Sequence, residues 1–81
     1  MADYHLGEIE SIFADIIWSN APLTSRLLAE LAEQRLRWKR TTTYTVLKRL
    51  CDRGLFQNQG GTVTALVSRE EFYARQSEEA G

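Results

Sequence analysis

Residues 38–54 contain threonines and cations at helical spacing, and both side-chain types can contact nucleic acid. At about 100° per residue, one side of the predicted helix carries small and apolar side chains, namely Thr43, Leu47, Leu50 and Cys51, with Val46 at the edge. The opposite side carries Thr41, Thr42, Thr45, Lys48 and Arg49. Threonine offers a hydroxyl and a methyl group to base edges, whereas lysine and arginine bind phosphates. This pattern suits a DNA groove, and a merely solvated helix face is the alternative.

The charged residues are segregated along the sequence. Residues 35–53 contain seven basic residues against one acid, a balance of +6, whereas the other residues contain three basic residues against ten acids, a balance of −7. The net charge of −1 therefore conceals a basic segment. Such segregation is expected of a domain that presents one face to nucleic acid, and chance clustering of surface charges is the alternative.

The sequence shows no residue set for catalysis, a cofactor or a metal ion. Cys51 is the only cysteine and lies on the core side of its predicted helix, so we interpret it as a small buried hydrophobe. His5 has no ligand partner at suitable spacing and is interpreted as a surface residue. No apolar run approaches the roughly 20 residues that span a bilayer, and there is no signal segment. We expect a cytoplasmic protein that is not an enzyme, with no cofactor, metal or membrane partner.

Hydrophobic spacing and capping residues predict the first two helices. An amphipathic helix over residues 6–18 is expected to begin at Gly7, with Glu10 at its third position, and to end before Pro22. Thr24 is the expected N-cap of the second helix. Its predicted buried stripe consists of Leu27, Leu28, Leu31 and Ala32.

The periodicity changes to that of strands after residue 54. Residues 55–57 and 62–67 are predicted to be strands joined by residues 58–61, whose paired glycines permit the positive φ angles of a tight hairpin. Ser68, with Glu71 three residues later, is predicted to cap a final helix.

The order of these elements predicts the fold class. Residues 34–39 form a basic connection anchored by Leu36 and Trp38, and we interpret Trp38 as a packing residue because it precedes the third helix. Three helices, a two-stranded wing and the start of a fourth helix make a mainly α winged helix-turn-helix with a small β-hairpin. In such a fold the third helix, predicted over residues 40–53, enters the major groove.

Several landmarks follow one another along nearly the whole chain. They are Leu6-Gly7-Glu8-Ile9-Glu10, Ile17-Trp18, Pro22-Leu23-Thr24, then Trp38 followed by Thr42, Thr45, Leu47, Arg49-Leu50 and Gly54-Leu55, and finally Leu66-Val67-Ser68-Arg69-Glu70-Glu71-Phe72. This order resembles the N-terminal winged-helix domain of the penicillinase and methicillin-resistance repressors and the related copper-responsive repressors (BlaI/MecI/CopY type). The resemblance implies a transcriptional repressor domain that reads operator DNA with its third helix.

The resemblance places Thr42 and Thr45 at the DNA surface and Arg49 toward phosphate, on the face that the helical spacing predicts. The expected DNA-binding residues are Lys39, Arg40, Thr41, Thr42, Tyr44, Thr45, Lys48 and Arg49. The wing departs from the family pattern because it lacks cations, so we expect its phosphate contacts to be weak or absent.

Family members carry a C-terminal dimerisation region, and this chain ends where that region would begin. We expect a DNA-binding domain over residues 1–67 and, over residues 68–81, the start of a C-terminal helix or a linker toward that region. The expected partner is double-stranded operator DNA. The parent protein is expected to be a homodimer, with a monomer as the alternative for this chain alone. The acidic total charge and uncharged wing leave a second function open, a winged-helix protein-interaction module that does not bind DNA.

Overall fold

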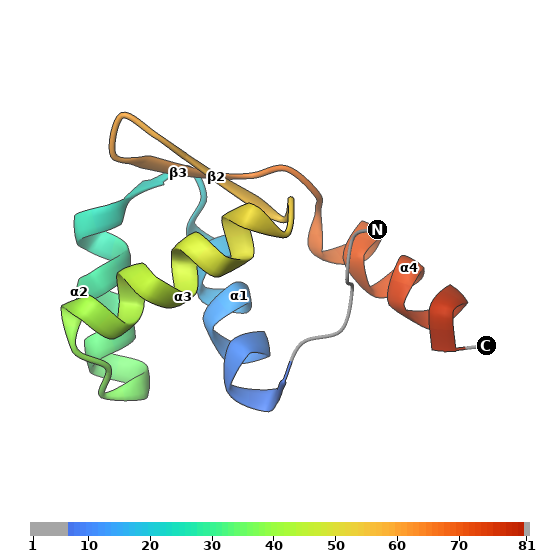
Figure 1. Ribbon diagram of the computed structural model, residues 1–81, viewed down its shortest axis with the longest axis horizontal. Helices are drawn as coiled ribbons and strands as arrows, with labels where there is room; N and C mark the ends of the chain where they lie inside the picture. The colour runs from blue at the N-terminus through green and yellow to red at the C-terminus, as the bar shows by residue number, and fades with distance from the viewer. Residues whose placement is uncertain (1–6, 81) are drawn as a thin grey trace.

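The computed structural model describes residues 7–80, and their side chains as far as residue 76. The predictions for His5 and for a helix start at Leu6 lie outside these residues. In chain order the elements are α1 (Glu8–Asn20), β1 (Leu23–Thr24), α2 (Ser25–Leu36), α3 (Arg40–Asp52), β2 (Phe56–Gln59), β3 (Thr62–Ala65) and α4 (Arg69–Ala80). Figure 1 shows α3 lying across α1 and α2 below the β2–β3 hairpin, with α4 extending away on the side opposite α2. The predicted winged-helix fold is confirmed.

The predicted helix caps form at both α1 and α2. Gly7 is the N-cap of α1, and its N–H donates to Glu10 Oε1 over 3.4 Å. The helix ends at Asn20, two residues later than expected, because Ala21 before the proline is extended at φ −68° and ψ 142°. At α2, Thr24 Oγ1 accepts a hydrogen bond from the Leu27 N–H at 3.0 Å, as its capping role requires.

Two details of α2 differ from the prediction. The helix continues to Leu36, which packs against the core, and ends where Arg37 adopts a left-handed conformation at φ 59°. The basic connection is therefore shorter than the predicted residues 34–39. Leu27, expected in the buried stripe, is 42% exposed. The buried residues of α2 are instead Leu28, Ala29 and Ala32. The side of the helix that carries them faces the core, and Leu27 lies outside that side.

The sheet contains a third strand that the sequence did not predict. Strands β1, β3 and β2 lie in that order and are antiparallel, and β1 joins the hairpin by pairing Leu23 with Val63. The β2–β3 turn is shorter than the predicted connection over residues 58–61, because Asn58 and Gln59 belong to β2. It consists of Gly60 and Gly61, whose φ angles of 62° and 85° are the predicted positive values. Strand β3 ends at Ala65, two residues before the predicted end. The wing is therefore anchored to the segment immediately before α2.

A single core holds the three helices, the wing and the start of α4. Its fully buried large side chains include Phe13, Ile17, Leu28, Leu50, Leu55, Phe56, Val63 and Phe72. Trp18 joins these parts, because its indole N–H donates to the Val67 carbonyl at 2.9 Å and its ring lies 5.5 Å from that of Phe72. Trp38 packs 5.0 Å from the Phe13 ring, which confirms its predicted packing role.

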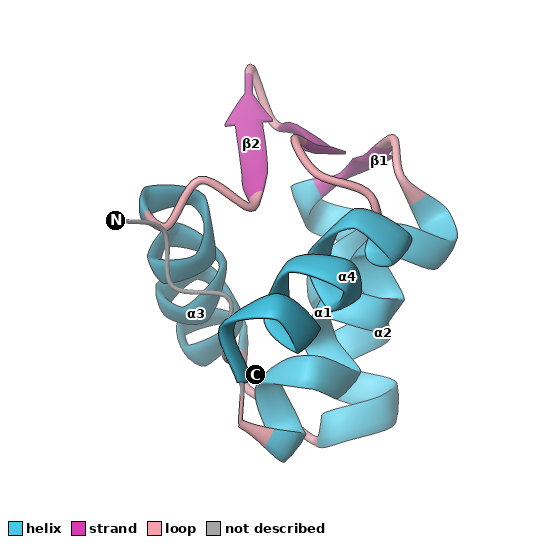
Figure 2. Ribbon diagram, turned by 90° about the vertical axis from the view of Figure 1, so that its right-hand side faces the viewer, coloured by secondary structure: helices cyan, strands magenta, loops and turns pink. Residues whose placement is uncertain are grey.

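An ion pair also fixes the start of α4 to α1. Arg69 Nε lies 3.1 Å from Asp15 Oδ1, and Arg69 Nη2 donates to Ser19 Oγ at 2.9 Å. The predicted cap forms as well, since the Glu71 N–H donates to Ser68 Oγ at 3.0 Å. In Figure 2, α4 points toward the viewer in front of α1, and α3 lies on the left.

Candidate nucleic-acid interface

The structure separates the two predicted faces of α3. Thr43, Val46, Leu47 and Leu50 are buried, and the half-buried Cys51 packs against the same core. All eight predicted DNA-binding residues are exposed, namely Lys39, Arg40, Thr41, Thr42, Tyr44, Thr45, Lys48 and Arg49. Burial of one helical stripe therefore fixes α3 with its threonines and cations turned outward.

Gly54 and Lys39 bound this outer face. Gly54 has a φ of 83°, which a non-glycine residue adopts only with strain, so the chain turns from α3 into the wing here. At the other end, Lys39 is the N-cap without a side-chain capping bond, Arg40 is the first helical residue, and the first turn contains no acid. Two cations thus add to the partial positive charge of the helix start.

The threonine hydroxyls are not equivalent. Thr45 Oγ1 donates to the Thr41 carbonyl at 2.9 Å, so its hydrogen is already used within the exposed face. The Thr45 oxygen keeps its acceptor sites, and its methyl group is free for apolar contact. Thr43 makes the corresponding bond to the Lys39 carbonyl at 3.2 Å, but on the buried side. Thr45 is therefore arranged to accept a hydrogen bond, for which base amino groups are suitable donors.

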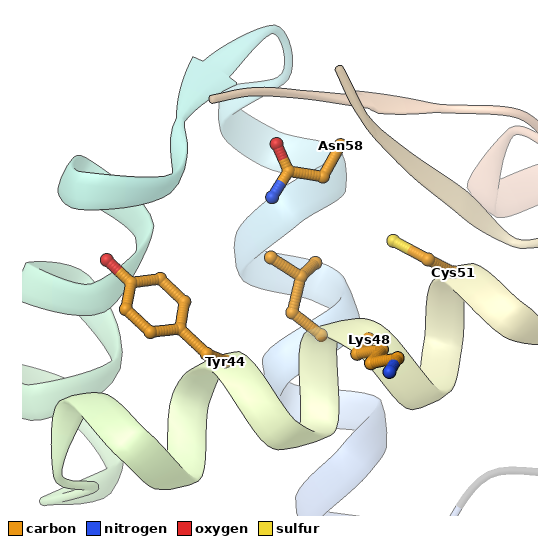
Figure 3. A pocket seen from close by; sticks show the side chains of 5 residues that line it. Tyr44, Lys48, Cys51 and Asn58 are labelled. Atoms are coloured by element: carbon orange, nitrogen blue, oxygen red, sulfur yellow. The ribbon is translucent and has the colours of Figure 1, made fainter. Parts of the chain in front are cut away.

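A pocket of about 360 Å³ lies between α3 and the wing. Tyr44 stands at one end and Cys51 at the other, and Asn58 reaches from β2 toward the space between them (Figure 3). Sequence reasoning gave Asn58 no individual role. Strand alternation could have placed it, because side chains two residues apart share a face and Phe56 is buried.

Cys51 has the character of a structural thiol. Burial raises the pKa of the Cys51 thiol, a hydrogen bond from the Asn58 backbone partly offsets this rise, and the Asp52 charge adds to it. The reactive thiolate is therefore disfavoured at neutral pH.

Two of the basic residues line pockets that also contain acids. Arg35 lines a pocket between α1 and α2 that also contains Asp15. Arg37 lines another pocket with Glu30 and Glu33. The exposed cations of α3 and its N-cap are Lys39, Arg40, Lys48 and Arg49.

Arg49 has a partner that the sequence did not reveal. Its Nη1 lies 3.7 Å from Glu10 Oε2 in the first turn of α1. The two residues are 39 positions apart, so only the packing of α1 against α3 brings them together. The predicted phosphate contact of Arg49 would therefore be made beside this carboxylate.

Among residues 7–80, no group of three or more histidine, cysteine or carboxylate side chains could hold a metal ion. Within that range, no helix is both long enough and apolar enough to cross a bilayer.

A comparison with protein families supports the architecture independently. The model of the family described as penicillinase repressor matches residues 6–80. The chain belongs to the penicillinase repressor family. This confirms the resemblance that the sequence landmarks indicated, and a repressor family is not a class of enzymes. No curated protein matches the chain.

Proposed function

We propose that this penicillinase repressor family member provides the DNA-binding domain of a transcriptional repressor, with α3 reading operator DNA in the major groove. The observation that carries the proposal is the exposed threonine and cation face of α3, opposite a buried stripe. Membership of a repressor family supports DNA binding as the role of that face.

The proposal divides the outer face by chemistry. Thr41, Thr42 and Thr45, together with Tyr44, contact base edges through hydroxyl, methyl and ring atoms. The cations of the same surface bind phosphates and fix the helix in the groove; they are Lys39, Arg40, Lys48 and Arg49. The wing residues Gln57, Asn58 and Gln59 are uncharged, so the wing adds little to phosphate binding.

The proposal also covers assembly. We propose that the predicted winged-helix domain over residues 1–67 is the DNA-binding unit, that the start of α4 completes its core through Phe72, that residues 68–81 lead toward a dimerisation region, and that the parent protein binds as a homodimer. One domain then covers one half-site and binds weakly, because a single module buries only part of the usual contact area.

Salt titration of DNA binding tests the proposal. Four cations contribute a slope of log K against log salt of between about −3 and −4. Binding to a labelled random-sequence duplex, followed by fluorescence anisotropy, should then weaken about 60- to 250-fold between 50 and 200 mM salt. No binding at 50 mM salt, or a slope near zero, would contradict the proposal.

A further inference from the structure

The Arg49–Glu10 ion pair connects the proposed DNA-binding face to the first turn of α1. The Arg49 side chain is 59% exposed, whereas that of Glu10 is 25% exposed. Glu10 Oε1 accepts the Gly7 N–H, which holds the carboxylate at the helix start. Glu10 Oε2 is buried and accepts no hydrogen bond from the part of the chain that the structure describes. This second oxygen faces Arg49 and receives no hydrogen bond within that part.

A carboxylate at this distance changes what Arg49 offers to DNA. A phosphate approaching the guanidinium is attracted by Arg49 and repelled by Glu10, so the net attraction is smaller than for a lone cation. Lys48 provides the internal comparison. It is the adjacent residue, is exposed, and forms no ion pair with the residues that the structure describes.

We infer that Glu10 is a positioning residue that withholds part of the Arg49 charge from the DNA backbone. It limits how tightly the domain binds any DNA, while the threonines of α3 set which sequence is preferred. This inference rests on the proposed function, since it assumes that α3 binds DNA. Because phosphate contacts carry no direct sequence information, the effect is equal for preferred and scrambled duplexes.

Glu10→Gln is the primary variant. The amide oxygen can still accept the Gly7 N–H, while the negative charge is lost. We expect the salt slope to steepen by up to about 0.9, which corresponds to up to about eightfold tighter binding at 0.1 M salt. The affinity ratio between a preferred duplex and a scrambled one should stay constant.

Asp15→Asn is the matched control. It removes one carboxylate from the same helix and changes the net charge equally, but its ion-pair partner is Arg69 of α4. We expect the salt slope to remain that of the wild type. A gain shared by both variants would mean that total charge, rather than the Glu10–Arg49 pair, is responsible, and it would overturn the inference.

Substitution of the cations gives a second, independent comparison. In the wild-type background, Lys48→Gln removes a cation without an ion pair and should flatten the salt slope by about 0.9. Arg49→Gln should flatten the slope by clearly less. In the Glu10→Gln background, Arg49→Gln should flatten the salt slope by the full value of about 0.9. This non-additivity is the signature of direct coupling between the two residues.

The outcomes separate the two claims. Absence of DNA binding by the wild type would refute the proposed function and, with it, this inference. Wild-type binding with a Glu10→Gln slope that is unchanged or flatter would refute the inference alone. If Glu10→Gln does not fold, equal losses of slope in wild-type Arg49→Gln and Lys48→Gln would refute it, and a smaller loss for Arg49→Gln would support it.

Discussion

Replacing Thr45 with valine removes one hydroxyl from the outer face of α3 while both branches of the side chain remain. In the structure the hydroxyl hydrogen is donated to the Thr41 carbonyl at 2.9 Å. The oxygen can therefore accept one hydrogen bond from a base amino group but cannot donate without breaking that bond. Valine keeps the apolar contact with a base and loses only this acceptor.

The expected loss follows from this single contact. One net hydrogen bond is worth about 0.5–1.5 kcal/mol, a factor of about 2 to 12 in affinity. We expect Thr45→Val to lower the affinity for the duplex that the wild type selects from a random library by this factor. Affinity for a scrambled duplex should stay the same, and both can be measured by fluorescence anisotropy at one salt concentration.

Thr43→Val is the matched control for this experiment. Thr43 lies on the same helix and makes the same kind of bond, to the Lys39 carbonyl, but it is fully buried. The change can alter stability but should leave the ratio between selected and scrambled duplexes unchanged. An unchanged ratio in Thr45→Val, or an equal fall in Thr43→Val, would refute the assignment of Thr45 to a base.

Other substitutions test phosphate binding and the scaffold. Lys48→Gln should weaken binding to every sequence and flatten the salt slope by about 0.9, and a sequence-dependent loss would argue against a phosphate contact. Leu50→Ala should lower the free energy of unfolding by about 2–5 kcal/mol in urea titration, because Leu50 is fully buried. Gly54→Ala should also lower it, by about 1 kcal/mol or more, since alanine is strained at a φ of 83°. Cys51 should react with iodoacetamide more slowly than free cysteine at pH 8, because its raised pKa keeps it protonated; equal rates would contradict that reasoning.

Features determined by neighbouring residues were predictable from the sequence. The Thr24 and Ser68 caps form because each side-chain oxygen accepts a hydrogen bond from the backbone N–H three residues later. Gly54 and the Gly60–Gly61 turn adopt the positive φ angles that glycine favours. Helical spacing likewise separated the buried stripe of α3 from its exposed face.

Features determined by distant residues were not predictable in the same way. Strand β1 has only two residues, and it exists because Leu23 pairs with Val63, 40 positions later. The Arg49–Glu10 pair depends in the same way on how α1 meets α3. Leu27 shows the remaining difficulty, since several leucines on α2 can form an apolar stripe and only the packing decides which one faces water.

Titration of the isotope-labelled domain with a random-sequence duplex library, followed by backbone amide NMR shifts, tests the central claim most directly. If α3 reads DNA, shifts at low salt concentrate in residues 39–49 and fade as salt is added. No shifts at millimolar duplex would contradict the account and favour a protein-interaction module, and shifts confined to α1 and the outer side of α2 would contradict it by placing DNA on another surface.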